Sequence, residues 1–210
     1  MKKITRKKHL EMKLQSVPAH PKPKVGLEQY TTPSVIASDL IWNAYSLGDV
    51  EGRDIVDLGC GTGIFAIGSS LMGANSSVGV DIDEDSIKLA QELKDKLKLT
   101  NLNFIVSNID DFNESSNVDT VFQNPPFGSQ KNADSGQDLR FIQKAIELET
   151  EVLYSFHMQS TEDFLIKYYE DNDFEITHIF RYKFPIPKIY DFHTKEKQNV
   201  NVIVIRAILK

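Results

Sequence analysis

The chain has 210 residues, 40% of them hydrophobic, a formal net charge of -6 and a single cysteine. This composition suits one globular domain and excludes a disulfide scaffold, a zinc cluster of Cys and His ligands, and a membrane span, because no apolar stretch is long enough to cross a bilayer. The N-terminus also lacks the apolar segment of a signal peptide, so we expect a cytoplasmic protein that binds no metal and no membrane.

The basic residues are concentrated at the two ends of the chain. Residues 1–24 contain eight Lys and Arg residues and one acid, Glu11, and residues 181–210 contain seven Lys and Arg residues and two acids. The part between these ends is acidic. Basic ends on an acidic body favour contact with nucleic-acid phosphates. We therefore expect residues 1–24 to be a basic extension and residues 25–210 to form the folded domain.

Two helices are predicted before the first strand. A short basic helix within residues 2–16 would place Leu10 and Leu14 on one side, and the prolines that begin at Pro18 end it. A second helix is predicted from Ser34 to Ser46, because its apolar residues recur at helical spacing. That spacing indicates packing against a core.

Strands and helices then alternate along the rest of the chain. We expect strands at 53–58, 77–82, 102–107, 118–123, 151–156, 174–184 and 199–208, and helices at 63–72, 84–98, 138–149 and 160–171. This alternation predicts an α/β fold: a doubly wound, mostly parallel, seven-stranded sheet with helices on both faces. Ligands of such sheets bind at the carboxyl ends of the strands.

The first strand leads into a glycine-rich turn, Gly59-Cys60-Gly61-Thr62-Gly63, and then into a helix near Ile64. This order is typical of a nucleotide-binding βαβ unit. A dinucleotide site would have G-x-G-x-x-G, whereas the spacing here is G-x-G-x-G. Asp57, at the strand end, would repel a diphosphate but suits a cationic ligand such as S-adenosylmethionine (SAM). The next strand ends at Asp81, where an acid would bind a ribose.

The fourth strand is followed by Asn124, Pro125, Pro126 and Phe127. Two prolines hold the backbone extended and remove two N–H donors, so the nearby carbonyls lack internal partners. An Asn amide oxygen beside such a carbonyl forms a pair of acceptors for a planar amine. Phe127 could stack on the conjugated ring that carries the amine. These four residues therefore predict a site that binds the exocyclic amine of a base.

The glycine turn, Asp57, Asp81 and the Asn-Pro-Pro-Phe motif occur in an order that resembles class I SAM-dependent methyltransferases acting on amines. Over nearly its whole length the chain resembles the archaeal–eukaryotic methyltransferase-like-5 family. The residues that carry this resemblance are Leu27–Thr32, Asp57–Gly61, Val80–Asp85, Leu99–Asn101, Asn124–Gly128, Tyr154, Ser155, His157, Phe192 and His193. The resemblance implies a Rossmann-like fold, SAM as cofactor, and N6-methylation of an adenosine in small-subunit ribosomal RNA. For the eukaryotic members it also implies a small zinc-containing activator protein.

The family's contacts can be carried over to positions of this chain. The expected cofactor-binding residues are Gln29, Thr32, Asp57, Gly59, Gly61, Thr62, Gly63, Ile64, Asp81, Ile82, Asn108 and Ile109. Among them, Gln29 and Thr32 resemble the contacts that cover the methionine end of SAM. Asn108 stands where the family usually has Asp, so we expect weaker binding of the cofactor's adenine there. Asn124, Pro125, Pro126 and Phe127 match the family's catalytic motif without change.

Other functions remain open from the sequence. A similar Asn-Pro-Pro-aromatic motif serves N2-methylation of guanine in RNA and N5-methylation of glutamine in proteins. Phe127 in place of Tyr and the basic N-terminus favour RNA over protein. A SAM-binding module without catalysis is a further alternative, and the intact motif argues against it. The roles of His157 and His193 are undetermined, and Lys131 and Arg140 are candidates for phosphate contacts.

Overall fold

The computed structural model describes residues 4–20, 31–113, 118–126, 136–187 and 197–210. Two of the expected site residues, Gln29 and Phe127, lie outside the described residues, as do Lys131 and His193. In the part of the chain that is described, no helix is long and apolar enough to cross a membrane.

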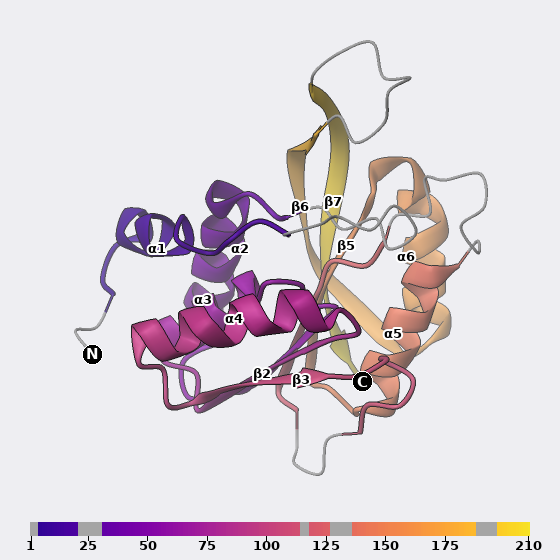
Figure 1. Cartoon of the computed structure of the whole chain (residues 1–210). Coiled ribbons are helices and arrows are strands. Elements are labelled where there is room, and N and C mark those ends of the chain that lie inside the picture. Colours follow the sequence, from indigo (N-terminus) through magenta and orange to yellow (C-terminus); the bar gives the residue numbers. More distant parts are fainter. Residues whose placement is uncertain (1–3, 21–30, 114–117, 127–135, 188–196) are drawn as a thin grey trace.

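The centre of the fold is a seven-stranded sheet with the strand order β3-β2-β1-β4-β5-β7-β6 (Figure 1). Its strands are β1 (Asp54–Leu58), β2 (Ser76–Asp81), β3 (Leu102–Val106), β4 (Thr120–Gln123), β5 (Val152–Met158), β6 (Phe174–Pro187) and β7 (Lys197–Leu209). Strands β1 to β5 pair in parallel, and β7 pairs antiparallel with both β5 and β6. The prediction of a mostly parallel, seven-stranded α/β sheet is confirmed.

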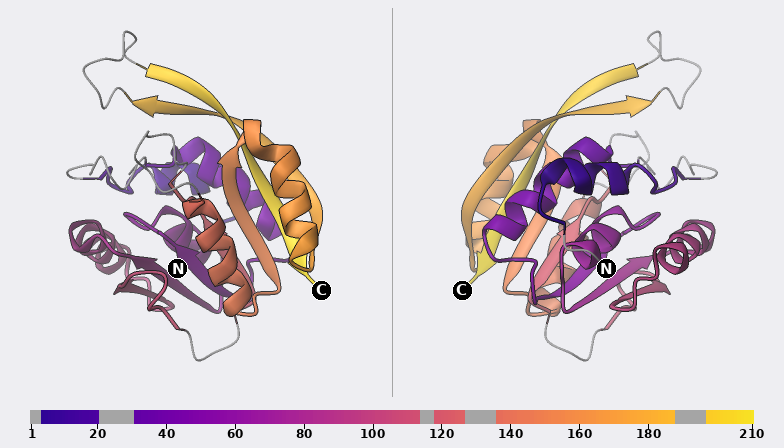
Figure 2. Two further views of the ribbon diagram at one scale, coloured as in Figure 1. Left: turned by 90° about the vertical axis from the view of Figure 1, so that its right-hand side faces the viewer. Right: turned by 90° about the vertical axis from the view of Figure 1, so that its left-hand side faces the viewer.

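Helices cover both faces of this sheet, as the two side views show (Figure 2). The helices are α1 (Lys7–Leu14), α2 (Ser34–Ser46), α3 (Ile64–Leu71), α4 (Glu84–Leu97), α5 (Gln137–Glu147) and α6 (Glu162–Asp171). Buried residues of α1 to α4 form one hydrophobic cluster, and those of α5 and α6 belong to a second cluster on the other face. The predicted helix over 160–171 differs at its start, where Gln159–Thr161 form a 3-10 turn before α6 begins.

The N-terminal helix α1 packs against the domain. Leu10 and Leu14 are buried side chains of the first cluster, together with Ile41 of α2. Gly68 of α3 permits this approach, because a Cβ there would lie 2.3 Å from Ile41 Cδ1 and 3.5 Å from Leu14 Cδ2. The apolar side of the helix is thus buried, and its lysines remain on the exposed side.

Strands β6 and β7 continue beyond the carboxyl end of β5 as a two-stranded arm. The last residue of β5, Met158, pairs with Val202, whereas residues 183–187 of β6 pair with residues 197–201 of β7 alone. The Tyr182 hydroxyl donates to Asp39 Oδ2 of α2 over 3.0 Å. The same carboxylate accepts from Lys7 Nζ of α1 over 2.6 Å, so Asp39 joins strand β6, at the base of the arm, to the N-terminal helix.

A buried ion pair joins the loop before β1 to the antiparallel part of the sheet. Arg206 of β7 donates from Nε to Asp49 Oδ2 over 2.8 Å and from Nη2 to Asp49 Oδ1 over 2.9 Å. The Tyr154 hydroxyl donates to Asp49 Oδ2 over 2.6 Å. Each buried charge is therefore paired and hydrogen-bonded, as a low-dielectric interior requires.

Candidate active site

The glycine turn connects β1 to α3 through backbone conformations that favour glycine. Gly59, Gly61 and Gly63 have positive φ angles of 66°, 52° and 86°. Such angles are costly for residues with a Cβ. Gly63 also faces Phe104, because a Cβ on it would come within 2.6 Å of two ring atoms. The geometry of the turn thus requires glycine at these positions, in addition to any need for a ligand to approach the backbone closely.

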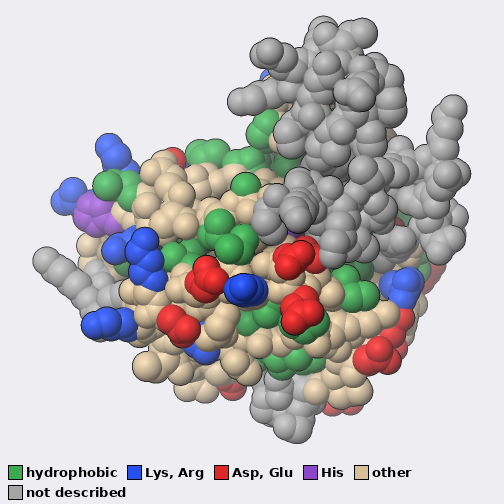
Figure 3. Space-filling model, viewed as in Figure 1, with side chains coloured by type: hydrophobic (Ala, Val, Ile, Leu, Met, Phe, Trp, Pro, Cys, Tyr) green, Lys and Arg blue, Asp and Glu red, His purple; other side chains and the backbone are tan. Residues whose placement is uncertain are grey.

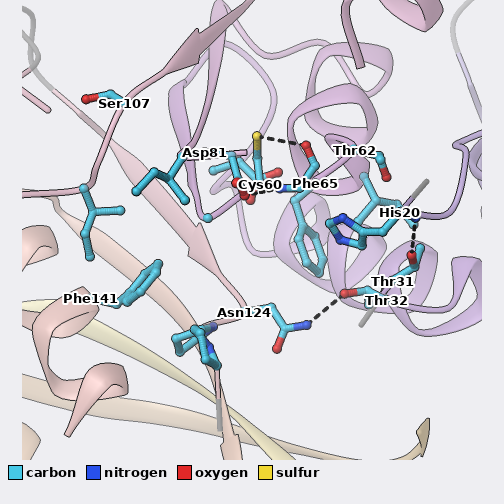
Figure 4. A pocket seen from close by; sticks show the side chains of 18 of the residues that line it. His20, Thr31, Thr32, Cys60, Thr62, Phe65, Asp81, Ser107, Asn124 and Phe141 are labelled. Carbon is cyan, nitrogen blue, oxygen red and sulfur yellow. Dashed lines mark hydrogen bonds between the residues drawn. The ribbon is translucent and has the colours of Figure 1, made fainter. Parts of the chain in front are cut away.

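A cavity of about 240 Å³ lies where this turn meets the carboxyl ends of β1, β2 and β4 (Figure 4). The expected site residues that line it are Thr32, Asp57, Gly59, Gly61, Thr62, Ile64, Asp81, Ile82, Asn108, Ile109, Asn124, Pro125 and Pro126. The structure therefore brings together residues from five separate segments of the chain. Gly63 is outside this lining and packs on Phe104.

Asp57 is 1% exposed at the end of β1, where its Oδ2 accepts a hydrogen bond from the Ala66 N–H over 2.9 Å. Burial raises the pKa of Asp57 to about 8, and Asp81 adds to the shift, while the Ala66 N–H opposes it. An uncompensated negative charge is costly in this environment. A cationic group in the cavity would offset that cost, so the site suits the positively charged methionine end of SAM.

Asp81 connects the glycine turn to the start of α4. Its Oδ2 accepts from the Gly61 N–H over 2.7 Å and its Oδ1 accepts from the Asp83 N–H over 2.8 Å. Burial raises the pKa of Asp81, and these two N–H donors act against that shift. Each carboxylate oxygen can accept a further hydrogen bond, which is what the hydroxyls of a ribose would supply.

His20 lines the cavity beside the glycine turn, a position that no motif in the sequence indicates. A Cβ on Gly61 would lie 2.7 Å from the His20 ring, so the absence of a side chain there allows the contact. Ser86 Oγ lies 2.9 Å from His20 Nδ1 and itself donates to Asp83 Oδ2 over 2.7 Å. Because Ser86 uses its only proton on Asp83, His20 Nδ1 is the donor and Nε2 carries the lone pair.

The backbone around His20 is held at two further points. Thr62 Oγ1 of the glycine turn donates to the Pro18 carbonyl over 2.7 Å, and the His20 N–H donates to Thr31 Oγ1 over 3.3 Å. Burial lowers the pKa of His20, although Asp81 and Asp83 act in the opposite direction. The His20 ring is therefore a neutral part of the cavity wall, and the bonds of its backbone to the surrounding turns explain its position.

Helix α5 supplies a further part of the cavity wall. Phe141 and Arg140 line the cavity, and a Cβ on Gly59 would lie 2.9 Å from Phe141 Cε1. Arg140 is also paired with Asp110, two residues after Asn108. From the sequence, Arg140 was predicted only as a phosphate contact, and Phe141 was not among the predicted site residues. An aromatic residue on an amphipathic helix usually means core packing, so its sequence position carried no signal of a site.

Asn124 follows β4 directly, and Thr32 orients its amide. Asn124 Nδ2 donates to Thr32 Oγ1 over 3.0 Å (Figure 4). Asn124 Oδ1 is buried and has no hydrogen-bond partner among the described residues. A buried acceptor without a donor costs free energy unless a ligand supplies the donor. The arrangement can therefore accept a hydrogen from an amine beside Pro125 and Pro126.

Comparison with known proteins agrees with this geometry. Residues 49–154 match the family model of the "Methyltransferase domain". The chain is 41% identical to an uncharacterized protein of Methanocaldococcus jannaschii, covering 97% of this chain and 94% of that protein. It is 34% identical to the rRNA N(6)-adenosine-methyltransferase METTL5 of Danio rerio, covering 95% of this chain and 97% of that protein.

A solved structure is similar over the same extent. The crystal structure of a putative RNA methyltransferase from Pyrococcus horikoshii has a TM-score of 0.87 and 36% sequence identity, and the match covers 98% of each chain. The similarity thus includes the sheet, the glycine turn and the segment after β4. The chain belongs to the methyltransferase-like-5 (METTL5) family of SAM-dependent methyltransferases.

Proposed function

We propose that this enzyme methylates the exocyclic N6 of an adenosine in RNA, with small-subunit ribosomal RNA as the substrate. The main supporting observation is the Asn124 amide, which Thr32 orients while Asn124 Oδ1 stays buried without a donor. Relatives from zebrafish, fruit fly and nematode that are named rRNA N6-adenosine methyltransferases support the choice of base and RNA.

In this proposal the enzyme acts mainly by positioning the amine. The target adenosine leaves the RNA stack, since its amine is otherwise inaccessible. Asn124 Oδ1 and the Pro125 carbonyl accept the two hydrogens of the N6 amine, and Phe127 stacks on the base. These bonds draw the nitrogen lone pair out of ring conjugation, which makes the nitrogen nucleophilic. No strong general base is needed, because the methylated amine readily loses its extra proton.

SAM supplies an electrophilic methyl group when it is bound. We assign its methionine end to Asp57, the glycine turn (Gly59, Gly61, Thr62, Gly63, Ile64), Gln29 and Thr32. Asp81 and Ile82 are assigned to the ribose, and Asn108 and Ile109 to the adenine. The support is that all of these residues, apart from Gly63 and the undescribed Gln29, line one cavity with Asn124.

The RNA would contact basic side chains near this cavity. Residues 1–24 are then a basic extension of the methyltransferase domain, residues 25–210. Lys7, Lys8 and Lys13 of α1 are exposed, and Figure 3 shows Lys and Arg side chains around this part of the surface. Over α4, by contrast, acidic side chains are mixed with lysines (Figure 3), so this surface attracts phosphates less. This distribution supports an RNA approach over α1.

We also propose a partner and a location. A small zinc-containing activator protein would bind the domain, as in the eukaryotic members of the family. The edge strand β3 and its half-exposed Val106 offer a surface for such a protein. A cytoplasmic location fits the buried free thiol of Cys60. Co-purification with tagged enzyme and cell fractionation test these two proposals.

The activity is tested with labelled SAM and unmethylated small-subunit ribosomal RNA, followed by nucleoside mass spectrometry. We expect labelled N6-methyladenosine. N2-methylguanosine in the same digest would show instead that guanine is the target base. A parallel reaction with a peptide-chain release factor tests glutamine methylation, and label in the protein instead of the RNA would overturn the proposal.

A further inference from the structure

We propose that His157 is a positioning residue for methyl transfer, as part of a largely buried chain of polar side chains formed by Gln123, Ser155, Tyr169, His157 and Asp138 (the His157 chain). The inference rests on the proposed function, in which Asn124 holds the target amine. The chain begins at the residue before Asn124 and ends in the first turn of α5, three residues before Phe141 of the cavity wall.

The first half of the His157 chain fixes the end of β4. Gln123 is fully buried, and its Nε2 donates to Ser155 Oγ of β5 over 2.9 Å. The two residues are register partners in the parallel β4–β5 pair. Ser155 also interacts with the Tyr169 hydroxyl of α6, and this interaction opposes the rise that burial causes in the pKa of Tyr169. These side chains lie on the α5 and α6 face, since the neighbours Val121 and Leu153 belong to that cluster.

The second half of the chain reaches α5. His157 Nε2 lies 3.2 Å from the Tyr169 hydroxyl, and His157 Nδ1 lies 3.3 Å from Asp138 Oδ2. A carboxylate can only accept, so the imidazole proton is on Nδ1 and the Tyr169 hydroxyl donates to Nε2. In this half of the chain the donors therefore point in one direction, from Tyr169 to Asp138. Burial lowers the pKa of His157, which agrees with a neutral ring.

Both ends of the His157 chain are close in sequence to residues that line the cavity. At one end, Gln123 precedes Asn124. At the other end, Asp138 precedes Arg140 and Phe141, which line the cavity. Burying a polar chain costs free energy that an apolar core would not cost. The His157 chain holds the start of α5 at a set position relative to the end of β4. It thereby sets the distance between Asn124, which follows β4, and Phe141 of α5 on the cavity wall.

A pair of matched variants separates positioning from general stability. Tyr169 and Tyr154 are both fully buried, and each donates a hydrogen bond through its hydroxyl. Tyr169→Phe interrupts the His157 chain, whereas Tyr154→Phe affects only the pair of Asp49 and Arg206. We expect Tyr169→Phe to lower the single-turnover methylation rate about tenfold and Tyr154→Phe to change it less than about twofold. Equal rates in the two variants would refute the positioning role.

Coupling along the chain gives a second measurement. Asp138→Ala removes the acceptor of His157 Nδ1 at a partly exposed position, so it supplies the same test if Tyr169→Phe does not fold. The rate losses of Asp138→Ala and Tyr169→Phe should not add in the double variant, because either change interrupts the same chain. Losses that add in this double variant would contradict the inference, whereas we expect the losses of Asp138→Ala and Tyr154→Phe to add.

Hydrogen–deuterium exchange tests the inference without any methylation assay. Tyr169→Phe and Asp138→Ala should raise amide exchange at residues 138–142 of α5, and Tyr154→Phe should leave it unchanged. Unchanged exchange in all three variants would overturn the inference even if the enzyme is active. If the wild-type protein forms no N6-methyladenosine but the exchange result holds, the proposed function fails while the structural coupling stands.

Discussion

Thr32 and Asn124 are 92 positions apart in the chain, and the Asn124 amide donates a hydrogen bond to the Thr32 hydroxyl over 3.0 Å. This bond engages the Nδ2 atom of the Asn124 amide and orients the group, so that Oδ1 remains available to accept a hydrogen from the target amine. We expect Thr32→Val to lower kcat about tenfold, because the amide can then rotate and lose its orientation. Thr32→Ser keeps the hydroxyl and should retain most of the activity. Steady-state methylation kinetics distinguish the two variants, and equal kcat values would disprove the orienting role.

Asn124→Ala should abolish methyl transfer and leave cofactor binding nearly intact. The variant removes an acceptor for the amine, while Asp57, Asp81 and the glycine turn are unchanged. Methylation of RNA and calorimetric binding of S-adenosylhomocysteine measure the two effects separately. Turnover at the wild-type rate in this variant would be incompatible with the assigned role of Asn124.

The buried Asp57 makes stability depend on pH. Its pKa is raised from 3.8 to about 8 in the folded protein, so between these values it is protonated when folded and ionised when unfolded. The folded state therefore binds more protons, and the free energy of unfolding should fall as pH rises from about 4 to 8, by on the order of 1 kcal/mol per pH unit. Above about pH 8 both states are ionised and this contribution becomes constant.

Asp57→Asn is the control for this pH dependence, because the amide resembles the protonated acid and can still accept from Ala66. Urea unfolding of both proteins at several pH values gives the difference in stability. The variant should gain stability relative to the wild type as pH rises from 4 to 8. A difference that does not change over this interval would show that Asp57 titrates normally.

His20→Ala should weaken S-adenosylhomocysteine binding about fivefold, since a partly buried ring that lines the cavity contributes roughly 1 kcal/mol of contact. His9→Ala is a matched control, because His9 is exposed on α1. Isothermal titration calorimetry of both variants measures the change in Kd. If the two variants bind equally well, His20 makes no contribution to the cofactor site.

Gly63→Ala should destabilise the fold by about 3 kcal/mol, through both its positive φ and the clash with Phe104. Gly48→Ala isolates the backbone effect, because Gly48 has a similar φ of 87° and a Cβ there would have no neighbour within 4 Å. We expect the control to lose only about 1 kcal/mol. Chemical denaturation measures both, and equal losses would mean that Phe104 adapts to the extra methyl group.

The periodicity of apolar residues in the sequence was sufficient to predict the helices and strands. The predicted helix from Ser34 to Ser46 agrees with α2, and the seven predicted strands are all present in the sheet. The reason is that helices and strands repeat every few residues, so apolar spacing reports them locally. The carboxyl-end rule for parallel sheets also predicted that Asp57, Asp81 and Asn124 would meet.

Contacts between segments that are far apart in the chain were decided only by the tertiary structure. His20 lies on Gly61, Phe141 lies against Gly59, and Thr32 holds Asn124, although no local pattern pairs these positions. Such contacts depend on where the chain returns after each element, and that path results from packing of the whole core. The residue types and their order therefore determine the fold and the class of chemistry, whereas the folded chain determines which side chains complete the cavity.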